Sequence, residues 1–249
     1  MLVPGACLGG WAWREVAGLL RAHGHDTYPV TLTGLGDRVH LASPQVDLET
    51  HIADVVNLLD YEALTDAVLV GHSYAGIVVT GVADRRPERL RGVVYLDTSP
   101  LPSGFSLADI QTREARERQK HDAEERGDGW RWPPPDRATL ESGAYGSAAG
   151  LSDHHFRLLE ERATPQPYAT FTQPLQLRHE APPGVRRAAI FASEGGIDVA
   201  TVRRLIEEGD PRAAVFAGTD WELHELPTGH WAMFSLPALL ADLLHAIAA

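Results

Sequence analysis

The chain has 249 residues, of which 44% are hydrophobic, and this is enough apolar material for one sizeable core. Acidic residues outnumber basic ones by 34 to 22, which gives a net charge of -12, and the basic side chains are scattered. This balance argues against a nucleic-acid partner and against an anionic membrane surface.

The chain carries a single cysteine, Cys7, so no disulfide can form within it and no thiolate metal cluster can be built. A reducing, cytoplasmic compartment fits this composition best. The opening segment MLVPGACLGGWAW is apolar but has no basic leader and is broken by Pro4 and Gly5. Since no later run reaches the roughly 18 to 20 apolar residues of a membrane span, the sequence predicts neither secretion nor membrane insertion.

Short β-branched runs alternate with segments of helical periodicity, which is typical of a parallel sheet covered by helices on both faces. About six strands are expected in one α/β core. In chain order, the predicted elements are a strand at 2–3, a helix at 13–23, a strand at 27–31, a helix at 47–59, a strand at 67–70, a helix ending at 84, a strand at 92–96, a strand at 188–192, a helix at 199–208, a strand at 221–226 and a helix at 237–249.

The alternation stops over residues 98–185, where the sequence becomes charged and then rich in Pro, Trp, Gly and Ala. We therefore predict a core of residues 1–97 and 186–249, with an insertion over 98–185. The charge run TREARERQKHDAEER lies in this insertion, and its mixed signs favour a solvated helical face over a partner-binding helix.

The segment DAVLVGHSYAG predicts a nucleophilic serine at Ser73. A strand precedes Ser73 and a helix follows it, which is the context of the sharp turn that exposes a nucleophile. Gly71 and Ala75 lie two residues to either side, where small side chains are a steric need. The usual pattern has glycine at the place of Ala75, so the motif departs by one methyl group. A helix-capping serine is the alternative; a phosphate loop is excluded because no Lys-Ser/Thr pair follows the glycines.

A serine hydroxyl needs a base within hydrogen-bond reach, and His230 is the candidate among the 12 histidines. It lies in LPTGHWAMFSLP, after the last predicted strand, where a loop at the carboxyl edge of a parallel sheet can bring it to the serine. His72 is expected to point to the other side of the turn and to pack or hydrogen-bond structurally. No HExxH or comparable ligand set is present, and His154, His155 and His224 lack a partner spacing, so neither a metal nor another cofactor is predicted.

The segment PGACLGGW follows the first predicted strand, and its glycines let the backbone approach a substrate closely. The backbone N–H groups of Ala6 and of Tyr74, the residue after the predicted nucleophile, are candidates for an oxyanion hole. A tight glycine-rich turn without a ligand is the alternative for this loop.

Together these segments resemble the α/β-hydrolase superfamily, and within it the small bacterial esterases related to plant methylesterases and hydroxynitrile lyases. The matching stretches are LVPGACLGGWAW, TLTGLGDRVHL, VLVGHSYAGIVVTGVADRRPERLRGVVYLD, TPQPYATFTQPL and PTGHWAMFSLP. They run over most of the chain and leave residues 105–150 unmatched. The resemblance implies an α/β-hydrolase fold in which the insertion forms a helical cap before the last two strands.

The resemblance also implies a chain order of serine, acid and histidine, and here the acid does not match cleanly. The usual acid follows the strand AAIFAS, where Gly195 aligns with it and Glu194 and Asp198 flank it. A minority of the superfamily takes the acid from the end of the preceding strand, which is Asp97 in this chain. We favour Asp97 as the residue that orients His230, with Glu194 and Asp198 as alternatives.

Two departures from the resembled lyases favour hydrolysis. Hydroxynitrile lyases carry threonine at the place of Gly5 and lysine directly after the catalytic histidine, where this chain has Trp231; its one lysine is Lys120. The resembled proteins usually have His-Gly before the oxyanion residue, and this chain has Pro4-Gly5 there. The strand before this dipeptide is nearly absent, which a start codon assigned too late would explain. The prediction is a serine hydrolase that cleaves a small, largely apolar ester or related acyl compound.

Two alternatives remain open. One is a lyase or cyclase that uses the same scaffold with an altered triad, and the other is a ligand-binding receptor without catalysis. A small molecule is the expected partner in each, and the sequence indicates no oligomeric state. In the insertion, four aromatic residues could line a pocket or form a small core of their own: Trp130, Trp132, Tyr145 and Phe171.

Overall fold

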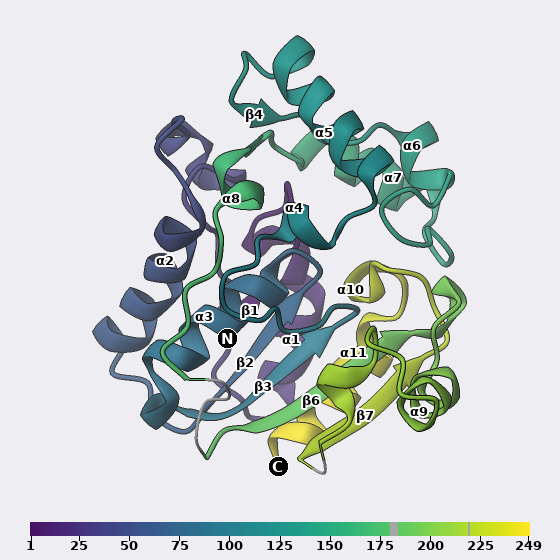
Figure 1. Ribbon diagram of the computed structural model, residues 1–249. Coiled ribbons are helices and arrows are strands. Elements are labelled where there is room, and N and C mark those ends of the chain that lie inside the picture. Colours follow the sequence, from purple (N-terminus) through teal and green to yellow (C-terminus); the bar gives the residue numbers. More distant parts are fainter. Residues whose placement is uncertain (180–183, 219) are drawn as a thin grey trace.

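Five parallel strands form the central sheet of the computed structural model, which describes residues 1–179, 184–218 and 220–249 (Figure 1). Their spatial order is β1-β2-β3-β6-β7, and every neighbouring pair is parallel. The predicted α/β-hydrolase fold is confirmed, with five strands in place of about six. The strands are β1 (Leu2–Val3), β2 (Ala67–His72), β3 (Leu90–Leu96), β6 (Arg186–Ala192) and β7 (Trp221–Leu226).

The prediction of a strand at 27–31 was wrong. This segment pairs with the edge strand β1 through a single bridge between Leu2 and Pro29. The N–H of Leu2 donates to Tyr28 O and the N–H of Val30 donates to Leu2 O, each over 2.9 Å. Pro29 has no N–H to donate, and β1 is only two residues long, so the single bridge is not extended into a ladder.

Helices cover both faces of the sheet, as the alternating pattern predicts. Because successive strand residues point to opposite faces, Leu69 of β2 packs with α2 and α3, whereas Val70 packs with α1 and α11. The helices of the core are α1 (Arg14–Ala22), α2 (Leu48–Tyr61), α3 (Ala75–Arg85), α9 (Val199–Glu207), α10 (Ala232–Ser235) and α11 (Pro237–Ala248), with 3-10 turns at Gly10–Trp13, Gly36–Leu41, Pro87–Arg89, Ser193–Gly195 and Ala214–Phe216.

Residues 105–172 lie over the carboxyl ends of the strands, in teal and green in Figure 1. The charge run predicted to be helical forms α5 (Arg113–Arg126), which buries Gln119 and Ala123. The other elements of this segment are α4 (Leu107–Ile110), α6 (Arg137–Glu141), α7 (Asp153–Arg162), α8 (Ala169–Thr172) and a small antiparallel sheet of β4 (Arg131–Trp132) and β5 (Gln166–Pro167). Across the described residues, no helix has the length and apolar character to span a bilayer.

Candidate active site

Ser73 occupies the sharp turn between β2 and α3 that the sequence predicts. Its φ of 52° lies in the left-handed region, which an L residue enters only under constraint. A Cβ at Gly71 would lie 2.7 Å from a methyl group of Val79 and 2.9 Å from the carbonyl oxygen of Ala75. Glycine at position 71 therefore lets α3 start immediately behind the serine, while the methyl group of Ala75 is accommodated in the core.

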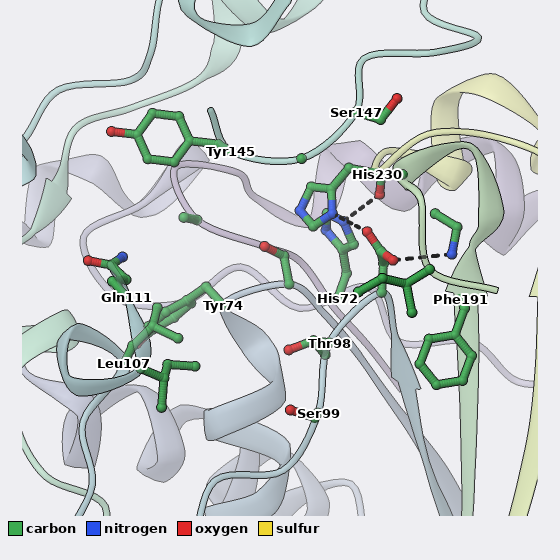
Figure 2. Close-up of a pocket in the computed structure, with 18 of the residues that line it drawn as sticks. His72, Tyr74, Thr98, Ser99, Leu107, Gln111, Tyr145, Ser147, Phe191 and His230 are labelled. Carbon is green, nitrogen blue, oxygen red and sulfur yellow. Dashed lines mark hydrogen bonds and ion pairs between the residues drawn. The ribbon is translucent and has the colours of Figure 1, made fainter. Parts of the chain in front are cut away.

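Asp97 and His230 are directly joined. The Nδ1 atom of His230 lies 2.5 Å from Oδ2 of Asp97, and the other carboxylate oxygen of Asp97 accepts a hydrogen bond of 3.1 Å from the N–H of Ala192 (Figure 2). Asp97 follows β3 directly and has a φ of 48°. The backbone of Asp97 is therefore in the left-handed region, as the backbone of Ser73 is. Of the three candidate acids, the structure brings this one to His230.

The environment of Asp97 keeps its carboxylate ionised. Burial raises its pKa, but the hydrogen bond from His230, the neighbouring histidines and the N–H of Ala192 together hold the pKa below its ordinary value. An ionised acceptor fixes the proton of His230 on Nδ1 and leaves Nε2 free to act as a base.

The two alternative acids have other positions. Glu194 is exposed in the turn after β6, and its backbone N–H donates to Thr228 O. Asp198 is the N-cap of α9, and its carboxylate accepts the N–H of Thr201 at 2.7 Å. Neither carboxylate is hydrogen-bonded to His230 within the described structure.

His72 supports the loop of His230 from below. Its Nε2 lies 2.8 Å from the backbone oxygen of His230, and the two rings are 4.6 Å apart. Burial lowers the pKa of His72 to about 3, so the ring is neutral and donates this hydrogen bond. A Cβ at Gly5 would lie 2.7 Å from Nδ1 of His72 and 3.1 Å from Cβ of Ser73, so the segment after β1 packs closely against the serine turn.

The N–H groups of Ala6 and Tyr74, the predicted oxyanion donors, have no hydrogen-bond acceptor among the described residues. Both residues line the cavity that contains Ser73. The hydroxyl of Ser73 likewise has no hydrogen-bond partner among the described residues; in free enzymes such contacts commonly tighten only when substrate binds.

A buried polar network that the sequence did not reveal holds residues 4–11, the segment after β1, in place. Cys7 adopts a φ of 64°, and its N–H donates to Oε1 of Gln166 at 2.8 Å. The Nε2 of Gln166 donates to Thr170 Oγ1, which in turn donates to Pro167 O. Gln166 and Thr170 are fully buried, and burial also raises the pKa of the Cys7 thiol, which makes it a poor nucleophile.

A second buried pair fixes the side chain of Tyr74. The ring of His51 lies between Tyr74 and Thr33, with Nδ1 2.8 Å from the phenol oxygen and Nε2 2.9 Å from Thr33 O. Because burial lowers the pKa of His51 to about 4, the ring is neutral. Its Nε2–H then donates to Thr33 O, and its Nδ1 accepts from the Tyr74 hydroxyl.

The segment 144–150 holds the His230 loop from above. The N–H of His230 donates to Ser147 O at 2.7 Å, and that of Gly229 donates to Ala149 O at 3.2 Å. Gly146 has a φ of 106°, and a Cβ there would lie 2.6 Å from Cγ of His230. The glycine- and alanine-rich run ESGAYGSAAG was the available signal for this close approach, but His230 lies 84 residues beyond Gly146 in the sequence.

One cavity of about 580 Å³ contains Ser73, Asp97 and His230. Of the four aromatic residues singled out in the insertion, Trp132, Tyr145 and Phe171 line it, and the ring of Trp132 packs edge to face against each of the other two. The ring of Trp130 instead packs against Arg131, whose guanidinium carbon lies 5.4 Å from the ring centroid. In residues 1–179, 184–218 and 220–249, no group of three or more His, Cys, Asp or Glu side chains is arranged to hold a metal ion.

Comparison with known proteins decides the family. The Alpha/beta hydrolase family matches residues 1–243. The chain belongs to this family. The α/β hydrolase is 32% identical to the carbendazim hydrolyzing esterase of Nocardioides sp. (strain SG-4G), over 99% of the chain and 98% of that protein. It is 31% identical to methylesterase 8 of Arabidopsis thaliana, over 41% of the chain and 38% of that protein.

Solved structures agree on the fold of this α/β hydrolase. An extracellular alpha/beta-hydrolase from a Paenibacillus species superposes with a TM-score of 0.80 at 21% identity, covering 98% of this chain and 96% of that one. The predicted resemblance is therefore confirmed, and so is the predicted class, an α/β hydrolase of the esterase type.

Proposed function

We propose that the protein is a serine esterase in which Ser73 is the nucleophile, His230 the general base and Asp97 the orienting acid. The observation that carries the proposal is the 2.5 Å contact between Asp97 and His230 in the cavity that also contains the strained Ser73. Nucleophile, base and orienting group from three chain segments then meet at one edge of the sheet, as acyl transfer requires.

The proposed reaction has two halves. His230 Nε2 takes the proton of Ser73 Oγ as that oxygen bonds to the ester carbonyl carbon. When the tetrahedral intermediate collapses, the bond to the alcohol oxygen breaks and His230 returns the proton to the leaving alcohol. A water molecule, deprotonated by His230, then attacks the acyl carbon; the bond to Ser73 Oγ breaks, His230 returns the proton to that oxygen, and the carboxylic acid leaves.

The N–H groups of Ala6 and Tyr74 stabilise the negative oxygen of both tetrahedral intermediates in this proposal. Their lack of acceptors among the described residues supports the role, because an N–H group that is not already hydrogen-bonded is available when negative charge develops on the substrate oxygen. The hydrogen bond from Cys7 to Gln166 holds the backbone that presents one of them.

We propose a small, largely apolar carboxylic ester as substrate, with residues 98–185 as a cap over it and 1–97 with 186–249 as the catalytic core. The cavity is walled by Trp132, Tyr145 and Phe171 from the proposed cap and by Phe191 and Trp231 from the core. The relatives that are named as esterases support an ester substrate, and the name of one of them states that it hydrolyses carbendazim. We also expect the enzyme to work in the cytoplasm, because its one cysteine is unpaired.

The lyase alternative finds less support. A threonine at position 5 would bring its Cβ within 2.7 Å of His72 Nδ1, so the loop could not take that residue without moving His72. After His230 comes Trp231, whose ring stands perpendicular to the imidazole at 4.9 Å and offers no positive charge for a leaving anion.

Stopped-flow kinetics with p-nitrophenyl acetate test the proposal. Wild-type enzyme should release a burst of p-nitrophenolate equal to the enzyme concentration if deacylation is slower than acylation, and Ser73→Ala should lose both burst and turnover. Unchanged turnover in Ser73→Ala would rule out the serine mechanism. Failure of the wild type to turn over any ester while still binding esters in the cavity would support the receptor alternative.

A further inference from the structure

The cavity of the proposed active site is lined by apolar side chains in two separate groups. One group lies beneath the proposed cap and includes Leu107, Trp132 and Phe171. The other comes from the end of β6 and from the segment that follows it: Phe191, Ile197, Val202, Leu205 and Phe216. We call the part of the cavity beside this other group the second lobe.

The two groups lie on opposite sides of the proposed catalytic residues. Figure 2 shows Leu107 and Phe191 on opposite sides of His230, with Thr98 and Ser99 between them. Thr98 and Ser99 also line the cavity, so their hydroxyl groups separate the two apolar groups. A molecule that reaches from one apolar group to the other therefore passes the reacting centre.

The packing of α9 leaves apolar surface accessible in the second lobe. Phe191, Val202 and Phe216 belong to a small buried cluster that is separate from the clusters packed on α2 and α3 and on α1 and α11. At the edge of this small cluster, Leu205 is only half-buried and Ile197 is 51% exposed. A ligand group in the second lobe removes this apolar surface from water, which favours its binding.

The size of the cavity also exceeds what a small ester requires. A volume of about 580 Å³ lies in the range of pockets that enclose a drug-sized ligand. An ester with one ring and a methyl or ethyl group on the other side would occupy one of the two apolar groups and leave the other without a ligand contact. The lining therefore fits a longer molecule with two apolar ends.

We infer that the substrate carries an apolar group about the size of a ring on each side of its ester linkage, one bound beneath the proposed cap and the other in the second lobe. This inference rests on the proposed esterase function and makes its substrate class more specific. The ester linkage then lies at Ser73, where Thr98 and Ser99 also line the cavity, so its polar atoms are not buried against apolar side chains alone.

Four esters with no ring, one ring or two rings test the inference: ethyl acetate, 2-phenylethyl acetate, ethyl 3-phenylpropanoate and 2-phenylethyl 3-phenylpropanoate. Two CH₂ groups separate each ring from the ester group, so the four ester groups have similar intrinsic reactivity. The released acid is titrated at constant pH. Each ring should raise kcat/KM by about 10- to 100-fold, because it is buried in a lobe of its own. The two gains should multiply in the ester with both rings, because the lobes are separate.

Two substitutions that each fill one part of the cavity should separate the two gains. Leu205→Trp places a ring in the second lobe, and Leu107→Trp places one beneath the proposed cap; both leucines are half-buried and line the cavity. Each variant should lose the gain from one ring and keep the gain from the other, and the two variants should lose different gains. Arg203→Trp, at an exposed position of α9, is the control and should keep both.

A second ring that adds nothing to kcat/KM in the wild type would overturn the inference, and this comparison is decisive even where a variant fails to fold. Loss of the same gain in both leucine variants, or both gains kept in Leu205→Trp, would also overturn it. The gain that each variant keeps shows that the variant is folded. Failure to hydrolyse any of the four esters, or hydrolysis that persists in Ser73→Ala, would instead contradict the proposed esterase function.

Discussion

At the scale of single residues, the choice of acid is the sharpest prediction. Asp97→Asn should lower kcat by up to about 10⁴-fold with little change in KM, because the amide no longer fixes the proton of His230 on Nδ1. Glu194→Gln and Asp198→Asn are matched controls and should change kcat by less than about twofold, since neither carboxylate contacts His230. A large loss in Glu194→Gln and a small one in Asp97→Asn would show that the acid is misassigned.

The sequence could predict Ser73 and His230, because a glycine-flanked serine between a strand and a helix and a histidine after the last strand are local patterns. It left three candidate acids, because a carboxylate at either of two neighbouring strand ends can reach the same edge of the sheet. The choice depends on the left-handed turn at Asp97 and on the N–H of Ala192, which lies 95 residues away in the chain.

A glycine pair in the proposed cap gives a second prediction at this scale. Gly146→Ala places a methyl group against His230, whereas Gly143→Ala, at a φ of 75°, meets nothing within 4 Å. Both lose the backbone freedom of glycine and should lose about 1 kcal/mol of unfolding free energy. Only Gly146→Ala should also lower kcat, by about 100-fold, because it displaces the base. Equal kcat values in the two variants, with thermal melts as a folding check, would contradict this role.

Among the secondary-structure elements, β5 and α8 of the proposed cap hold the proposed oxyanion segment, residues 4–11, through the hydrogen bond between Cys7 and Gln166. Gln166→Leu leaves the N–H of Cys7 without its acceptor and should lower the unfolding free energy by about 1 to 3 kcal/mol. It should also weaken binding of a boronic acid that mimics the tetrahedral intermediate more than binding of the carboxylic acid product. Gln176→Leu is the exposed control, and equal weakening of both ligands in Gln166→Leu would mean that the network is only structural.

Most elements of the core could be predicted from periodicity, because each strand and helix carries its own apolar pattern. The segment at 27–31 could not, since its β-branched residues look like a strand while Pro29 and the two-residue β1 prevent a ladder. The contacts of the segment 144–150 with the His230 loop could not be predicted either, because the glycine- and alanine-rich run ESGAYGSAAG permits a close backbone approach without indicating which distant segment approaches.

At the scale of the whole molecule, two buried histidines should make stability depend on pH. Burial lowers the pKa of His51 to about 4 and that of His72 to about 3, while both titrate near 6.5 when unfolded. Below pH 6.5 the unfolded chain therefore binds protons that the folded chain does not. The unfolding free energy should fall by about 1 kcal/mol per pH unit for each histidine as pH drops from 6.5 toward 4.

Urea unfolding at several pH values checks this dependence. His51→Gln should reduce the slope by the contribution of one proton, whereas His121→Gln, at an exposed position of α5, should not reduce it by that amount. A wild-type slope near zero between pH 6 and 4.5 would mean that the two rings are charged in the folded protein.

We propose that the fold as a whole presents Ser73 to the substrate for covalent catalysis. Mass spectrometry of peptides from enzyme quenched in acid during turnover of p-nitrophenyl acetate tests it most directly. We expect an acetyl group on the peptide that contains Ser73, at a level that falls to background in Ser73→Ala. An acetyl group on another residue, or continued hydrolysis without any acylated peptide, would contradict it.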